Sequence, residues 1–250
     1  MQEQQFLNYS AVKLKVISVS IVKICGLKEI EHIQKSASWG ANLLGMVFVE
    51  GAKRTISINQ AILMKKSIAT VQTTGNKSHT FKFRFSPSVV GVFYNQNIEY
   101  VKKIVDTVGL DVIQLTGDEK PEDWLRLDMP IIKVCHVDSS NQNSVKLLSR
   151  ELYALSELGI IPLLDTKSIK GSGGTGEKFN WDIAFKLREK GHNFMLAGGL
   201  DVENVSQAIS QTKANGVDVS TGVETNGIKD LTKIQSFINL VHSHTPGEIQ

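Results

Sequence analysis

Several features that mark special classes of protein are scarce in this sequence. Its 250 residues include two cysteines, Cys25 and Cys135, too few for a disulfide framework and with no zinc-site spacing. The apolar run Val16–Val22 has seven residues, against about 20 needed to span a bilayer. A net charge of +3 is too small to predict a nucleic-acid-binding surface. We therefore expect a globular protein that binds neither membranes nor nucleic acids.

The N-terminal segment shows no sign of export. Met1–Phe6 is polar, with no basic segment before a long apolar core, so we expect no signal peptide and a cytoplasmic location. Because the first clear strand begins at Ile21, we interpret residues 1–20 as an extension. The length suits one large domain or two small ones, and residues 21–245 match the size of one (β/α)₈ barrel. It leaves no room for a second enzyme, and we expect a monomer.

Short apolar or β-branched runs recur along the chain, and several are apolar at consecutive positions. That pattern is typical of parallel strands buried on both faces. The predicted strands are Ile21–Cys25, Leu43–Val49, Val89–Phe93, Val112–Leu115, Ile131–Val134, Ile160–Leu164, Phe194–Ala197 and Val217–Val219.

Helical patterns separate these runs. The predicted helices are Ile30–Gly40, Asn59–Ala69, Ile98–Val108, Val145–Leu158, Asp182–Glu189, Val202–Gln211 and Leu231–His242, with a shorter segment at Glu122–Leu127. Gly40, Gly109, Gly159 and Gly191 stand where helices should end, and Asp201 is the expected N-cap of the helix at Val202. Eight strand–helix units predict a single (β/α)₈ TIM barrel, of the α/β class, with an open doubly wound sheet as the alternative.

One irregular stretch, residues 71–88, falls between the second helix and the third strand. In a barrel this position lies at the bottom face, opposite the chemistry, so we interpret it as a tolerated insertion. Its alternating segment Phe81–Phe85 could also form an edge strand or a basic-aromatic patch.

Polar and glycine residues gather where the predicted strands end, which is the catalytic face of a barrel. Asp165 follows an apolar run, and partial desolvation would raise its pKa toward that of a general acid, although it could merely cap a loop. Cys25 stands beside Gly26 and could be a thiolate base if Lys23 lowers its pKa, or simply a packed core residue. Cys135 lacks such a glycine and is a core candidate.

Glycine-rich loops follow the last three strands. Gly198, Gly199 and Gly222 could let backbone N–H groups approach a phosphate, or could only form tight turns. The segment Gly171–Gly176 matches G-x-G-x-x-G, but five residues separate it from the strand, so a mobile substrate-covering loop is favoured over a dinucleotide site. Arg54 suits bidentate recognition of a carboxylate, unless it is simply an exposed loop residue.

Taken together, the strand-end motifs resemble those of phosphoribosylanthranilate isomerases of the fungal type, from Val22 to about Val241. The resemblance rests on segments that occur in the family's order, namely Val22–Leu27, Lys53–Ile56, Val90–Phe93, Ile113–Glu119, Gly173–Trp181, Leu196–Leu200 and Gly216–Glu224.

The resemblance implies an Amadori rearrangement of N-(5-phosphoribosyl)anthranilate in tryptophan biosynthesis, without a cofactor and without a metal. It implies Cys25 as general base and Asp165 as general acid. It also implies that Arg54 binds the anthranilate carboxylate and that Asp218 contacts sugar hydroxyls. The implied phosphate-binding residues are Gly198, Gly199, Ser220, Thr221 and Gly222.

The chain departs from the family at three positions. Thr116 stands where the family usually has histidine; it could hydrogen-bond substrate but cannot titrate near neutral pH. Asn180 replaces a common aspartate and Thr221 a common serine, and both keep hydrogen-bonding capacity. The alternatives are another sugar-phosphate barrel enzyme, or a catalytically dead barrel that binds a phosphate ligand.

Overall fold

The computed structural model shows a closed barrel of eight parallel strands, β1 to β8, hydrogen-bonded in chain order with β8 returning to β1. It describes residues 21–69, 71, 81, 83, 87–138, 140–166 and 181–244. The strands are β1 Ile21–Ile24, β2 Leu43–Val47, β3 Ser88–Phe93, β4 Val112–Leu115, β5 Ile131–Val137, β6 Ile161–Thr166, β7 Met195–Leu196 and β8 Gly216–Val219. The predicted closed barrel is confirmed, and the open-sheet alternative is wrong.

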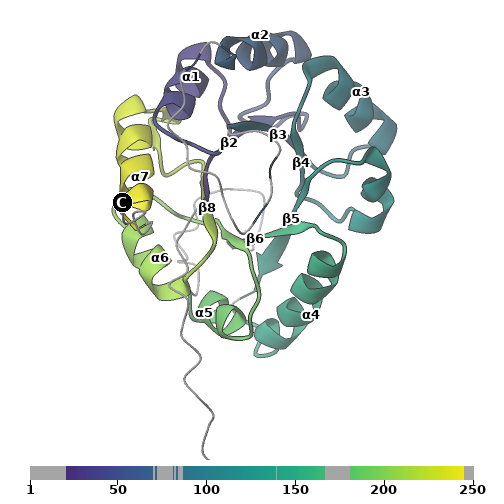
Figure 1. The fold of residues 1–250 in the computed structure, drawn as a ribbon, viewed down its shortest axis with the longest axis vertical. Helices are drawn as coiled ribbons and strands as arrows, with labels where there is room; N and C mark the ends of the chain where they lie inside the picture. The colour runs from purple at the N-terminus through teal and green to yellow at the C-terminus, as the bar shows by residue number, and fades with distance from the viewer. Residues whose placement is uncertain are drawn as a thin grey trace, which may run out of the picture.

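The helices form a ring around the strands, and α7 lies beside α1, where the ring closes (Figure 1). They are α1 Ile30–Ser38, α2 Ile58–Ile68, α3 Ile98–Val108, α4 Ser144–Glu157, α5 Trp181–Glu189, α6 Val205–Thr212 and α7 Leu231–Ser243. A 3₁₀ helix, η1 at Pro121–Leu127, takes the place of an α-helix between β4 and β5. A short antiparallel hairpin of β9, Glu224–Thr225, and β10, Ile228–Lys229, follows β8.

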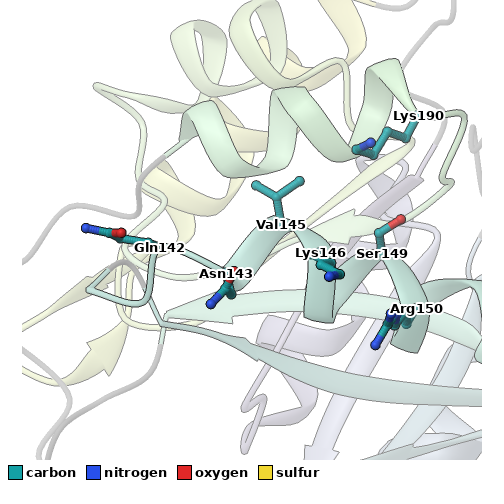
Figure 2. Close-up of a pocket in the computed structure, with 7 residues that line it drawn as sticks. All are labelled: Gln142, Asn143, Val145, Lys146, Ser149, Arg150 and Lys190. Carbon is teal, nitrogen blue, oxygen red and sulfur yellow. The ribbon is translucent and has the colours of Figure 1, made fainter.

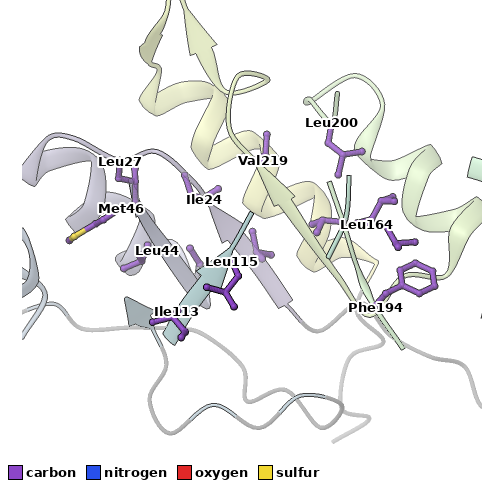
Figure 3. Close-up of a cluster of buried hydrophobic side chains, with 14 of the residues drawn as sticks. Ile24, Leu27, Leu44, Met46, Ile113, Leu115, Leu164, Phe194, Leu200 and Val219 are labelled. Atoms are coloured by element: carbon purple, nitrogen blue, oxygen red, sulfur yellow. The ribbon is translucent and has the colours of Figure 1, made fainter. Parts of the chain in front are cut away.

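Two apolar layers hold the barrel together because successive side chains of a strand point to opposite faces. The inner layer fills the barrel with residues such as Ile21, Leu43, Val90 and Met195. The outer, larger layer packs the other strand face against the helices; Figure 3 shows part of it, including Ile24, Leu44, Met46, Ile113, Leu115 and Phe194. Which layer a strand residue belongs to therefore shows whether it faces the interior or the helices.

The predicted strands and helices all occur, with ends that differ by a few residues. Gly40, Gly109, Gly159 and Gly191 have φ of 97°, 75°, 71° and 88°, the left-handed conformation expected just after a helix. The prediction for Asp201 was wrong. Helix α6 begins at Val205, not Val202, and the Asp201 carboxylate instead accepts hydrogen bonds from the N–H groups of Glu203 and Asn204 in the preceding turn.

Most of the predicted insertion at residues 71–88 lies outside the described residues, as do residues 1–20. Of its aromatic segment, Phe81 and Phe83 pack against the inner apolar layer. The segment joins the end of α2 to the start of β3, so it approaches the barrel from the end opposite the strand-end residues. Within the described part of the chain, no helix has the length and apolar character needed to cross a membrane.

Candidate active site

A polar layer replaces the apolar filling of the barrel toward the carboxyl ends of the strands. On β1, the residues that follow the inward-facing Ile21 at intervals of two are Lys23 and Cys25. On other strands, the same alternation turns Gln114, Asp165 and Asp218 inward. Residues from four strands that are far apart in sequence therefore meet at the mouth, where barrel enzymes carry out their chemistry.

Lys23 and Asp218 form an ion pair inside the barrel. They are partners in the β1–β8 register, and Lys23 Nζ lies 2.9 Å from Asp218 Oδ2. Their side chains are 0% and 8% exposed. Burial alone would lower the pKa of Lys23, but the charges of Asp218 and Cys25 outweigh it and raise that pKa. Lys23 is therefore a charged lysine held next to the predicted base.

Cys25 is a buried thiol, free of any disulfide, at the end of β1. Burial raises its pKa, and the Lys23 ammonium offsets this only in part. The hypothesis that Lys23 lowers this pKa is thus correct in direction, yet desolvation outweighs it. Room for the sulfur comes from Gly45 on β2, where a Cβ would lie 2.9 Å from Cys25 Sγ.

Asp165 is half-buried on β6, on the inward face that also carries Leu163. It is the register partner of His136 on β5, a residue the sequence analysis did not single out. His136 follows Ile132 and Val134 of the inner layer at intervals of two, so its exposed imidazole faces the mouth. Only the strand register reveals this neighbour of the predicted acid.

Gln114 and Thr116 bring uncharged polar groups into the same space from β4 and the residue that follows it. The Thr116 hydroxyl donates a hydrogen bond to the carbonyl of Phe93, which leaves its oxygen free to accept. Gln114 Oε1 and Asp218 Oδ1 are buried and lack hydrogen-bond partners among the described residues. Because buried acceptors are normally paired, these two oxygens suit a ligand that carries hydroxyl groups.

Arg54 is held in place by a bidentate ion pair with Glu224. Its Nε and Nη2 lie 2.6 and 2.8 Å from the two carboxylate oxygens, and the side chains are 21% and 6% exposed. Lys229 Nζ lies 3.0 Å from the same carboxylate. Burial raises the pKa of Glu224, but hydrogen bonds from Arg54 and Lys229 outweigh it and lower the pKa to about 2. The view of Arg54 as a simply exposed loop residue is wrong.

The loops after β7 and β8 are drawn together by glycine. A Cβ on Gly222 would lie 1.9 Å from the Leu200 carbonyl oxygen, and a bridge joins Asp201 to Gly222. Gly198 and Gly199 have φ of 86° and 68°, a conformation in which other residues are strained. Ser220, exposed Thr221 and Gly222 follow β8 directly, so these backbones are close enough to surround a small anion.

A separate hollow of about 540 Å³ lies against α4 and does not include the residues of this mouth. Figure 2 shows its lining from α4 and the preceding turn, with Lys190 facing it from the end of α5. Lys146, Arg150 and Lys190 make it basic, but it contains none of the strand-end residues. The chemistry therefore belongs to the barrel mouth.

The predicted site residues all lie at the carboxyl ends of the strands, as the sequence predicted. They are Cys25, Arg54, Thr116, Asp165, Asp218 and the loops after β7 and β8. The Gly171–Gly176 segment and Asn180 lie outside the described residues. Four further residues of the mouth were not predicted from the sequence: Glu224, Lys229, His136 and Gln114. For Glu224, the nearby Gly222 was a signal, whereas nothing in the sequence pairs it with Arg54, 170 positions away.

A closed barrel with titratable groups at its strand ends places the chain among the (β/α)₈-barrel enzymes. A family model described as N-(5'-phosphoribosyl)anthranilate isomerase matches residues 22–240. The chain belongs to this family.

Individual relatives agree with the family match. An N-(5'-phosphoribosyl)anthranilate isomerase of Dehalococcoides mccartyi is 37% identical over 88% of this chain and 94% of its own length. A multifunctional tryptophan biosynthesis protein of Schizosaccharomyces pombe is 35% identical over 95% of this chain, which spans 32% of that protein. The phosphoribosyl anthranilate isomerase structure from Thermotoga maritima is 31% identical, with a TM-score of 0.72 over 89% of this chain and 98% of that one.

Proposed function

We propose that this chain catalyses the isomerisation of N-(5-phosphoribosyl)anthranilate to 1-(2-carboxyphenylamino)-1-deoxyribulose 5-phosphate, a step of tryptophan biosynthesis. The observation that carries the proposal is the meeting of four features at one barrel mouth: a thiol, a carboxylic acid, an arginine and two glycine loops. The substrate has matching parts, since it carries a carboxylate, sugar hydroxyls and a phosphate. Membership of the isomerase family supports the same conclusion.

The chemistry needs one acid and one base. Protonated Asp165 gives its proton to the furanose ring oxygen, and the ring opens as the nitrogen lone pair forms a Schiff base at C1′. Cys25, as thiolate, then removes the proton from C2′, and the electron pair returns to nitrogen to give an enolamine. Proton transfer from the enol oxygen and to C1′ yields the ketone, so no atoms are gained or lost. One group must start protonated and the other deprotonated.

The site geometry favours Cys25 over Cys135 as this base. Cys25 lies inside the barrel beside the Lys23 ammonium, which stabilises a thiolate, whereas Cys135 belongs to the outer layer. Because burial keeps the resting Cys25 pKa above its ordinary value, the resting group is the thiol. The thiolate is therefore a minor form that Lys23 makes accessible during turnover.

Substrate recognition follows from the remaining groups. Arg54 binds the anthranilate carboxylate, because its guanidinium is a planar donor at the mouth. The unpaired oxygens of Asp218 and Gln114 accept hydrogen bonds from sugar hydroxyls, and Thr116 adds a weaker contact. The backbones at Gly198, Gly199, Ser220, Thr221 and Gly222 bind the phosphate.

No cofactor enters these steps. We place the reaction in the cytoplasm, where a free thiol persists, with the chain acting as a monomer.

The test is turnover of fluorescent phosphoribosylanthranilate by the purified chain. We expect Cys25→Ser and Asp165→Asn each to lower kcat by about 10³-fold or more, because each removes one partner of general acid–base catalysis. Near-normal turnover by either variant would show the acid–base assignment to be wrong. An undetectable rate in the wild type, with measurable binding of a product analogue, would instead indicate a catalytically dead barrel.

A further inference from the structure

Arg54, Glu224 and Lys229 form a largely buried cluster, here called the arginine clamp. It joins Arg54, the proposed carboxylate-binding residue, to the loop after β8, which belongs to the proposed phosphate site. Lys229 Nζ lies 3.0 Å from Glu224 Oε1 and donates a second hydrogen bond, 2.7 Å long, to the Ser220 carbonyl. The Ser220 hydroxyl in turn donates to the carbonyl of Cys25 at 3.3 Å. The clamp is therefore fastened both to the loop after β8 and to the strand end that carries the predicted base.

The clamp fixes which edge of Arg54 remains available. Glu224 occupies Nε and one hydrogen of Nη2, the side edge of the guanidinium. Within the part of the chain that the structure describes, Nη1 has no hydrogen-bond partner. A guanidinium can bind one carboxylate along its side edge and a second through the Nη1–Nη2 end. The occupied side edge thus leaves the end edge for a ligand.

Packing around the arginine limits its other conformations. A Cβ on Gly26, whose φ is 73°, would lie 2.3 Å from Arg54 Cδ and 3.3 Å from Ser220 Oγ. The arginine stem thus lies directly over Gly26, one residue from Cys25. With the Glu224 and Lys229 side chains 6% and 4% exposed, water does not compete strongly for the ion pairs. Arg54 is pre-organised by charge on one side and by contact on the other.

We propose that Glu224 is a positioning residue that holds Arg54 with its end edge free, and so makes the site selective for a substrate with an aromatic carboxylate. This inference rests on the proposed function, from which the substrate carboxylate comes. Pre-organisation spares the substrate the cost of ordering a long side chain. Lys229 supports Glu224 by balancing its charge. Since Glu224 contacts Arg54 and not the reacting carbons, the effect falls on binding and not on the proton transfers.

The test compares two substrates, phosphoribosylanthranilate and the N-(5-phosphoribosyl)aniline made by condensing ribose 5-phosphate with aniline, which lacks the carboxylate. In Glu224→Gln, the amide nitrogen faces a donor of Arg54 or Lys229, so the bidentate pair is lost. We expect KM for the carboxylated substrate to rise about 10- to 100-fold with kcat within about threefold, and the aniline analogue to change little. Glu224→Asp, which keeps the charge, should recover part of the lost selectivity.

Two controls separate positioning from simple loop damage. Inhibition by inorganic phosphate reports the loop after β8 and should be unchanged in Glu224→Gln. Glu99→Gln removes the carboxylate of an exposed ion pair with Arg126 on the helix ring and should leave all constants as in the wild type.

Three outcomes would overturn the inference. Equal losses with both substrates and weaker phosphate inhibition would show that Glu224 only fastens the loop. A lower KM for the carboxylated substrate would show that Glu224 competes with the substrate for Arg54. Unchanged constants would show that Arg54 needs no positioning. The absence of wild-type turnover is a different result, because it contradicts the proposed function itself.

Discussion

Two strands of this barrel carry the same short pattern, Lys-x-Cys, and the fold places the two copies in different regions. Lys23 on β1 and Cys25, which directly follows this strand, face the barrel interior, whereas Lys133 and Cys135 on β5 face the helix layer. Both lysines are buried near a carboxylate; Lys23 pairs with Asp218 at 2.9 Å, and Lys133 lies 3.7 Å from Glu119. Composition and burial are thus nearly the same in the two regions.

The difference lies in what surrounds each copy. Within the part of the chain that the structure describes, Asp218 retains an unpaired oxygen inside the barrel. Glu119 instead accepts hydrogen bonds from the N–H groups of Asn95 and Gly117, and Lys133 donates to the Gly117 carbonyl, so the outer group closes a turn. A buried charge therefore indicates chemistry only when its neighbours leave hydrogen-bonding capacity unused.

The sharpest test of this comparison replaces each cysteine by alanine. Cys25→Ala should lower kcat by about 10³-fold or more, because the C2′ proton loses its acceptor. Cys135→Ala should keep kcat within about twofold and cost roughly 1 kcal/mol of unfolding free energy, as expected for a small change in a packed layer. Steady-state kinetics and urea unfolding of both variants measure the two effects. Comparable loss of activity in the two variants would remove the functional difference between the regions.

The lysines offer a second test, with smaller effects. Lys23→Met and Lys133→Met each leave a buried carboxylate without its cation, and each should lose about 3–5 kcal/mol of unfolding free energy. Activity per folded molecule should fall much further in Lys23→Met, since Lys133 contacts Gly117 and Glu119 in the turn after β4, whereas Lys23 pairs with Asp218 inside the barrel. Urea unfolding combined with kinetics separates the two quantities.

A paired substitution checks the cause of the lysine effects. Adding Glu119→Gln to Lys133→Met removes the unpaired charge, and part of the lost stability should return. If stability does not return, the loss comes from the hydrogen bonds of Lys133 and Glu119 to the turn at Gly117 and not from the ion pair.

Sequence reasoning reached the barrel because eight apolar runs with intervening helical patterns specify local structure directly. It also placed Cys25, Asp165 and the glycine loops at one end, since strand ends can be located from the sequence. It could not identify pairs such as Arg54 with Glu224, because strand closure brings together residues 170 positions apart. It separated the two cysteines only by the glycine beside Cys25, because period-two alternation does not tell inward from outward residues until the strand register is known. Helix α6 was placed too early because Asp201 stabilises a turn with the same bonds an N-cap would make.

The smallest expected effect concerns alkaline stability, and it again contrasts the two cysteines. Burial raises the pKa of both thiols above 9.0; for Cys135, nearby Glu151 raises it further and well above that value, while Lys133 partly offsets the shift. The unfolded chain therefore loses its thiol protons first as pH rises, and above about pH 9 each cysteine lowers stability by up to about 1.4 kcal/mol per pH unit until its folded pKa is reached. Below pH 8 neither cysteine affects stability in this way.

Between pH 8 and pH 10, Cys135→Ala should lose about 1 kcal/mol less unfolding free energy than the wild type. For Cys25→Ala the difference from the wild type should be smaller, because Lys23 offsets part of the pKa shift of Cys25. Urea unfolding at the two pH values measures this difference, since all other titrating groups are common to the three proteins. If the difference from the wild type is larger for Cys25→Ala than for Cys135→Ala, Lys23 does not favour the Cys25 thiolate. The assignment of Cys25 as the base would then lose its electrostatic support.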